Sequence, residues 1–203
     1  MNYKFPFWSY EHLLHKIFRF FIFKRKFKKF GINAYLSPYS EILNMQYISI
    51  GNNVFIQNGA WFLALDRYAG DKHTPEIDIG DDVYMGHFCT LSAANCIRIG
   101  KSVLIGDNVI IGDSTHSYED ITKPVNSQPL TGPGRIIIND RVWIGKNVFI
   151  GTDLEIGEHS VIGANSVITK SVPPYTVVSG NPAMIIKQYS FKKKQWIKRI
   201  RKL

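Results

Sequence analysis

One histidine of the sequence lies where its side chain could do acid–base chemistry. His116 stands within the segment DSTHSYED (residues 113–120), in which carboxylates and hydroxyls surround it. Because an imidazole titrates near neutral pH, a histidine with carboxylates at hand can act as a general base. The alternative is a solvated loop histidine. We take His116 as the candidate catalytic residue, with Tyr118 and Glu119 beside it as candidate substrate-binding residues. The remaining histidines have no comparable surroundings: His12, His15, His73, His87 and His159.

His116 lies at the start of a long interruption in an otherwise regular sequence. Three six-residue repeats, which span residues 99–116, lead directly to it, and the segment 113–135 then departs from the pattern. Loops of this length inside compact domains are usually functional or disordered. A second interruption, at about residues 64–78, contains glycine and proline and is typical of a surface loop.

The regular part of the sequence repeats every six residues. A branched apolar residue returns at each sixth position, usually followed by glycine: Ile138, Ile144, Ile150, Ile156, Ile162 and Ile168, and earlier Ile50, Ile79, Met85, Ile99, Ile105 and Ile111. Neither a helix nor a single strand has this period, whereas hexapeptide repeats are typical of a parallel β-helix. Three hexapeptides would form one triangular coil of 18 residues. A β-sandwich, the alternative, would show irregular strand spacing. We therefore predict an all-β fold, a parallel β-helix shaped as a triangular prism.

The composition indicates one principal domain with two basic ends. The chain has 203 residues and a net charge of +9, yet residues 1–30 carry eight Lys and Arg against one acid, and residues 187–203 carry eight against none. The body between them carries nine bases against fifteen acids. Because the body is acidic, the basic total does not indicate nucleic-acid binding. With only Cys89 and Cys96, no clear signal pattern and no apolar run of 18 residues, we expect a cytoplasmic protein without a spanning helix or disulfides.

The two basic ends are predicted to be short helical arms. In the arm 1–30, aromatic residues recur at helical spacing among lysines and arginines; in the arm 187–203, Trp196, Ile200 and Leu203 do so. Such arms could cover the ends of the β-helix, or they could attach the protein to anionic lipid at the inner face of the membrane. Both roles can hold together, so the sequence leaves them open.

A resemblance to a known family rests on a longer stretch. Residues 142–187, VWIGKNVFIGTDLEIGEHSVIGANSVITKSVPPYTVVSGNPAMIIK, and the spacing from Ile99 to His116 resemble the hexapeptide-repeat acyltransferases. The sequence is similar to galactoside and maltose acetyltransferases and to bacterial surface-polysaccharide O-acetyltransferases, over about residues 31–187. The resemblance implies a left-handed β-helix, here the domain 31–186, and an acetyl-CoA-dependent O-acetyltransferase that acts on a sugar hydroxyl in O-antigen or capsule biosynthesis.

The resemblance also implies roles for individual residues. His116 would take the proton from the acceptor hydroxyl, whose oxygen attacks the thioester directly, and the family's homotrimers hold acetyl-CoA between neighbouring prisms. The implied cofactor-binding residues are Gly145 and Ala164 along the pantetheine, Thr169 and Lys170 near the nucleotide, and Lys187 in place of a phosphate-contacting arginine. Trp143 would lie beside the active centre as a substrate-binding residue. No metal is implied.

Two departures from the family pattern concern the acceptor and the cofactor. Gly86 occupies the position of an asparagine that helps to hold the acceptor, and Asn95 in the neighbouring coil could substitute for it. Lys146 stands where a small hydroxyl residue contacts the cofactor. Three alternatives follow: an N-acetyltransferase acting on an amino sugar, a non-catalytic scaffold, or a protein that binds anionic surfaces. A zinc enzyme on the same prism is rejected because no second histidine follows His116 before His159.

Overall fold

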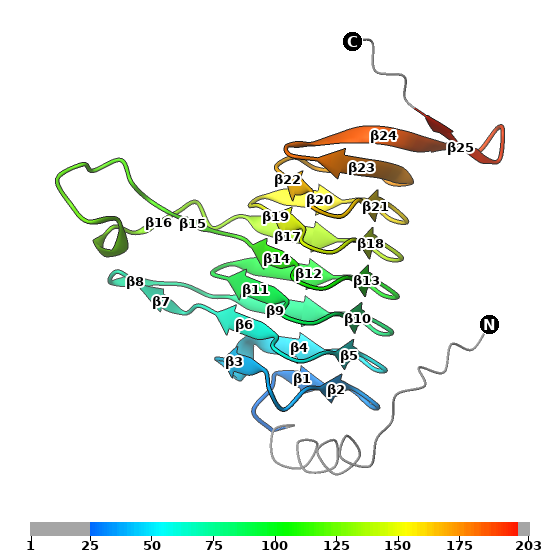
Figure 1. The fold of residues 1–203 in the computed structure, drawn as a ribbon. Coiled ribbons are helices and arrows are strands. Elements are labelled where there is room, and N and C mark those ends of the chain that lie inside the picture. Colours follow the sequence, from blue (N-terminus) through cyan, green and yellow to red (C-terminus); the bar gives the residue numbers. More distant parts are fainter. Residues whose placement is uncertain (1–24, 199–203) are drawn as a thin grey trace.

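The computed structural model describes residues 25–198 and shows the predicted left-handed parallel β-helix, in which six coils stack along one axis (Figure 1). Each coil contributes one short strand to each of three parallel sheets. The first sheet contains β1 (Lys29–Phe30), β4 (Ile48–Ile50), β9 (Glu76–Ile79), β12 (Cys96–Ile99), β17 (Arg135–Ile138) and β20 (Leu154–Ile156). The second contains β2 (Tyr35–Leu36), β5 (Phe55–Ile56), β10 (Tyr84–Met85), β13 (Leu104–Ile105), β18 (Trp143–Ile144), β21 (Val161–Ile162) and β23 (Thr176–Gly180). The third contains β3 (Glu41–Leu43), β6 (Trp61–Ala64), β11 (Thr90–Ala93), β14 (Ile110–Gly112), β19 (Phe149–Ile150) and β22 (Val167–Ile168).

The repeated apolar residue of each hexapeptide points into the prism and stacks on its equivalent in the next coil. In the second sheet, for example, Ile105 pairs in register with Met85 below it and with Ile144 above it. These side chains are fully buried, as are their equivalents in the other two sheets. The six-residue period therefore forms a continuous apolar column, which supplies most of the hydrophobic stabilisation.

Each coil has three corners, and we number them by the sheets that they join: first to second, second to third, and third to first. At the second corner a ladder of side-chain amides runs along the prism, because Asn108 donates to Asn147 and Asn147 donates to Asn165. All three asparagines have φ between 55° and 58°, the left-handed region that asparagine tolerates better than most residues. The corner sequence therefore sets both the turn and the bonding between coils.

Two insertions leave the prism at its third corner, in coils separated by one intervening coil, and extend to the same side (Figure 1). The first insertion, residues 65–75, follows β6 and forms a small hairpin from β7 (Arg67–Tyr68) and β8 (Asp71–Lys72). The second insertion, residues 113–134, follows β14 and contains β15 (Thr115–His116), the 3₁₀ turn η2 (Val125–Ser127) and β16 (Leu130–Thr131). Another 3₁₀ turn, η1 (Met45–Tyr47), lies between β3 and β4.

The predicted C-terminal helix is wrong within residues 187–198. The chain instead forms β24 (Ala183–Ser190), antiparallel to β23, and β25 (Gln195–Lys198), antiparallel to β24. The second sheet ends at β23 with backbone groups that need partners, and an added antiparallel strand supplies them. In the sequence, Trp196 and Ile200 have helical spacing. The open edge of the second sheet nevertheless makes residues 195–198 a strand.

The predicted N-terminal helical arm lies mostly outside the described residues, and its last part, residues 25–30, is a turn followed by β1. The charge of Lys28 in this part is already paired within the chain. Its ammonium group lies 2.9 Å from the carboxylate of Glu76, which also pairs with Arg98. Hydrogen bonds from Arg98 and Lys28 lower the pKa of the Glu76 carboxyl. Lys28 therefore joins the first coil to the third. Within residues 25–198 there is no helix that is long and apolar enough to cross a membrane.

Asp113 holds the third corner together at the point where the second insertion begins. Its buried carboxylate accepts hydrogen bonds from the backbone N–H groups of Ala94, Asn95 and Cys96, at 2.7 to 2.8 Å. Burial raises the pKa of the Asp113 carboxyl, and the three N–H groups act in the opposite direction. One side chain thereby provides acceptors for three successive donors of the coil below.

We expect Asp113→Asn to lower the free energy of unfolding by about 1–3 kcal/mol, because the amide would turn an NH₂ group towards backbone N–H donors and leave one without an acceptor. Urea denaturation followed by circular dichroism measures the change. Asp140→Asn is the matched control: Asp140 accepts one backbone bond, from Lys101, which an amide oxygen can replace. Equal stability of the two variants would contradict the role given to Asp113.

Candidate active site

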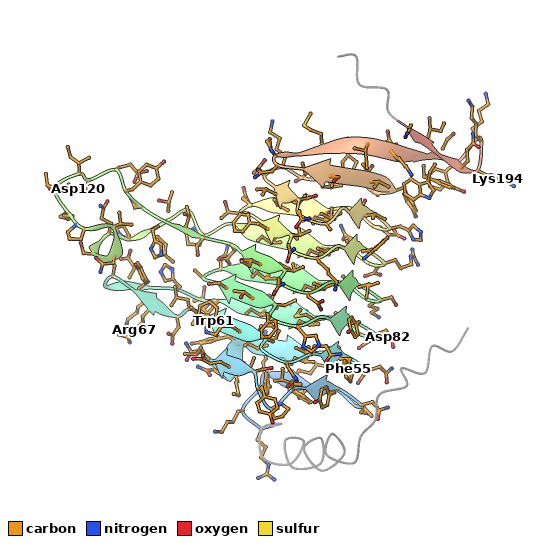
Figure 2. All side chains as sticks on the ribbon, viewed as in Figure 1. Phe55, Trp61, Arg67, Asp82, Asp120 and Lys194 are labelled. Atoms are coloured by element: carbon orange, nitrogen blue, oxygen red, sulfur yellow. The ribbon has the colours of Figure 1, made fainter. Side chains whose placement is uncertain are left out.

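The two insertions meet at His116. The ring of Tyr68, from the first insertion, lies 5.2 Å from the imidazole ring of His116, centroid to centroid, with the planes tilted by 52°. The Tyr68 hydroxyl donates to the backbone carbonyl of Asn126 in the second insertion, at 3.3 Å. Tyr68 therefore joins the two insertions directly beside the candidate catalytic residue. Figure 2 shows them side by side, with Arg67 in the first and Asp120 in the second.

The second insertion presents His116 on a short strand. β15 pairs antiparallel with β16, so that His116 lies opposite Leu130, and the N–H of Ser117 donates to the carbonyl of Pro129. Both residues of β15 are exposed. Antiparallel pairing fixes the backbone while the imidazole stays open to solvent, as a group that must reach a substrate requires.

Hydrogen bonds at the base of the second insertion tie both of its ends to the prism. The N–H of Gly134 donates to the carbonyl of Asp113, and the side-chain amide of Asn95 donates to the carbonyls of Pro133 and Gly134. The substrate-binding role of Asn95 stays a prediction, and in the structure its amide nitrogen donates to the loop backbone. Its observed contacts are thus structural, close to the start of the segment that carries His116.

The outer part of the second insertion is organised by one buried glutamine. The Gln128 side chain accepts from the N–H of Asp120 and donates to the carbonyls of Asp120 and Lys123. Tyr118 is exposed, as a residue that touches an acceptor would be. Glu119 accepts a hydrogen bond from the Ser117 hydroxyl, which lowers the pKa of its carboxyl. The Tyr68 ring is thus a neighbour of the imidazole, whereas the Glu119 carboxylate is bonded to Ser117.

The residues that the resemblance assigned to the cofactor occupy two corners. Gly145 and Ala164 lie at the second corner, in consecutive coils, and a Cβ on Gly145 would come within 2.7 Å of the Ala164 nitrogen. Stacking of the coils thus requires glycine at position 145. Thr169 and Lys170 follow β22 at the third corner, where both are exposed.

Lys146, which departs from the family pattern, pairs with Asp107 at 2.8 Å. The hydrogen bond from Lys146 lowers the pKa of the Asp107 carboxyl. Gly86 lies in the same part of the second corner, where a Cβ would come within 2.4 Å of the Asp107 carboxylate. The two departures are therefore connected through one acidic side chain.

Trp143 and Lys187 lie on the second sheet and its extension. Trp143 points outwards from β18 and is 52% exposed. Lys187 lies on β24, directly opposite Lys198 of β25. Lys198 was not predicted, and neither was Tyr68. Lys198 becomes a neighbour of Lys187 through strand pairing, and Tyr68 becomes a neighbour of His116 through the contact between the insertions.

The topology divides the candidate site between two edges of the prism. His116 leaves from the third corner, whereas Gly145 and Ala164 lie at the second corner, across the third sheet. One chain therefore does not bring His116 together with the predicted pantetheine-lining residues.

Comparisons with known proteins agree with this architecture. Residues 135–170 match the model of the family described as bacterial transferase hexapeptide (six repeats). Over 128 residues, which are 60% of this chain, the sequence is 34% identical to a putative lipopolysaccharide biosynthesis O-acetyl transferase of Escherichia coli strain K12. The chain spans 65% of the length of that relative.

Two solved structures illustrate the shared fold. An N-acyltransferase from Bacillus cereus in complex with dTDP and 3-hydroxybutyryl-CoA has a TM-score of 0.70 at 24% identity, with 95% of this chain and 93% of that chain covered. A hexapeptide-repeat acetyltransferase from Vibrio cholerae, complexed with acetyl coenzyme A, has a TM-score of 0.58 at 26% identity, with 85% and 77% covered. With its six stacked coils and its matched repeats, the chain is similar to the bacterial hexapeptide-repeat transferases.

Proposed function

We propose that the protein is an acetyl-CoA-dependent O-acetyltransferase that modifies a sugar hydroxyl during the synthesis of a bacterial surface polysaccharide. The observation that carries this proposal is the exposed imidazole of His116, held on a strand of the second insertion and packed against Tyr68 of the first. The similarity to the relative named for lipopolysaccharide biosynthesis supports the acceptor class.

In this reaction the imidazole of His116 accepts the proton of the acceptor hydroxyl. The oxygen attacks the carbonyl carbon of the acetyl thioester, the carbon–sulfur bond breaks, and the proton passes to the departing thiolate. An exposed histidine is suited to this role because it can take up and release a proton near neutral pH. Tyr68 limits the orientations of the ring, which favours attack from one direction.

The cofactor site in this proposal is formed between two chains of a homotrimer. Two faces of the prism support this assembly: Leu104 and Trp143 project from the second sheet, and Trp61, Ile110 and Phe149 project from the third. These side chains are between 37% and 52% exposed, whereas the first sheet presents mainly polar side chains. In a closed ring, each chain uses two different faces. Contact between the second-sheet face of one chain and the third-sheet face of the next would bring one chain's second corner near the other's third corner.

An N-acyltransferase that acts on an amino sugar is the second candidate. The Bacillus cereus structure, which is an N-acyltransferase with dTDP bound, favours it. Treating the labelled product with mild hydroxylamine separates the two, because an O-acetyl ester is cleaved and an N-acetyl amide is retained. A non-catalytic scaffold, the third candidate, predicts no turnover of acetyl-CoA at all.

We expect His116→Ala to lower the rate of acetyl transfer, or of acetyl-CoA hydrolysis, at least ~10²-fold, as the loss of a general base should. The fold should persist, because His116 lies on an insertion outside the prism. Release of free thiol from acetyl-CoA measures the rate, with His87→Ala as the histidine control. Activity of His116→Ala within a few-fold of the wild type would remove this residue from the mechanism.

Tyr68 is expected to act by positioning the imidazole. Tyr68→Ala should lower kcat/KM on the order of 10-fold or more, since small errors in the placement of a reacting group are costly. Tyr68→Phe keeps the ring beside His116 and loses only the bond to Asn126, so it should lower kcat/KM less. Both variants should unfold at the wild-type denaturant concentration. If Tyr68→Ala turns over like the wild type, the contact between the insertions does not serve the reaction.

The predicted trimer is tested by measuring the mass of the protein in solution. Light scattering of an active preparation at micromolar concentration should give three times the mass of one chain. Trp143→Glu, which puts a charge on an outward face of the second sheet, should lower that mass and the activity together. An active monomer would contradict a site formed between two chains.

A further inference from the structure

The C-terminal part of the chain is free of acidic residues. From residue 159 to the end there is no Asp or Glu, while nine Lys and Arg occur, six of them within the described residues. The acidic body therefore ends in a segment that carries only positive charge, and five of its six described lysines lie in β24, β25 and the turn between them.

The strands β24 and β25 and the turn between them, residues 183–198, form a hairpin that concentrates this charge. Lys187 and Lys198 lie directly opposite each other across the two strands, an arrangement that is unfavourable when nothing neutralises it. The turn carries Lys192, Lys193 and Lys194, all exposed. Within residues 25–198, none of these five lysines forms an ion pair.

Aromatic and aliphatic side chains lie among the lysines. Tyr189 packs edge-on against Trp196, at 5.4 Å, and against Phe191, at 5.2 Å. Phe191 also meets Tyr175 of the last coil at 4.9 Å, so the aromatic cluster connects the hairpin to the prism. Phe191 nevertheless remains 65% exposed, and Ile197 remains 39% exposed.

The hairpin projects from the prism on the side opposite the two insertions. Figure 2 shows Lys194 at its far tip and Asp120 at the other extreme of the molecule. A partner that binds the tip would therefore leave His116 accessible.

We propose that the hairpin 183–198 is a docking surface for a membrane leaflet that contains anionic phospholipids. Lysines attract such a surface, and exposed Phe191 and Trp196 suit the boundary between headgroups and acyl chains. The described hairpin has no arginine fork of the kind that reads phosphate or base edges in nucleic acids. This inference goes beyond the proposed function and does not depend on acetyl transfer.

The test is sedimentation of the full chain with vesicles of phosphatidylglycerol and phosphatidylethanolamine at physiological salt. The variant Lys192→Gln with Lys193→Gln and Lys194→Gln should lower the partition coefficient on the order of 100-fold. Arginine at the same three positions keeps the charge and should keep the binding. Vesicles of phosphatidylcholine alone should bind neither the wild type nor the variants.

A matched control removes the same charge elsewhere: Lys101→Gln, Lys123→Gln and Arg135→Gln together, which should bind anionic vesicles like the wild type. Loss of binding in this control, equal to that of the hairpin variant, would overturn the proposal in favour of net charge alone. Equal binding of the wild type to neutral and anionic vesicles would overturn it, as would a hairpin variant that binds like the wild type. Binding of a DNA oligonucleotide with no vesicle binding would assign the hairpin to another polyanion and also overturn it.

Discussion

The stacking of each coil on the next, in register, is the constraint on which the other features of this molecule depend. At the corners the coils approach so closely that a Cβ on Gly106 would come within 2.8 Å of the nitrogen of Lys146, and one on Gly157 within 2.2 Å of the nitrogen of Pro174. Inside, every sixth side chain must be apolar to continue the column. The interior and the glycine positions are thus fixed by packing, so functional variation is confined to outward faces, corner insertions and the two ends.

The candidate active site uses that freedom at the third corner. Two insertions leave from there, one coil apart from each other, and the prism fixes the second of them through Asp113 and Asn95 before the loop reaches His116. The first insertion then supplies Tyr68 as a neighbour. A rigid scaffold that holds loops at defined points can position a reacting group while it leaves the outer loop surface open to substrate.

The repeat determined what could be predicted from the sequence. A period of six predicts the coils, their inward residues and the point at which His116 leaves the prism, because these depend on nearest-neighbour stacking. The contact of Tyr68 with His116 joins residues 48 positions apart and has no periodic signal, although both interruptions follow third-sheet strands and so leave from one corner. The C-terminal strands were missed because Trp196 has helical spacing, whereas the open edge of the second sheet is visible only in three dimensions. The bonds of Asn95 to Pro133 and Gly134 have no signal in the sequence either, because they form only when the loop closes.

The second insertion has a further consequence for how sequences of this type can diversify. Across it, β12 pairs with β17 through residues 39 apart, as in Cys96 with Arg135, whereas the next coil pairs through residues 18 apart, as in Ile136 with Leu154. Doubling the length of a closed loop costs only about 0.6 kcal/mol of chain entropy. The third corner can therefore accept longer or shorter insertions at little cost to folding, provided that Asp113 and Asn95 keep the ends together. Insertion and deletion in this one segment can thus change the surface around His116, while the prism that holds the histidine stays the same.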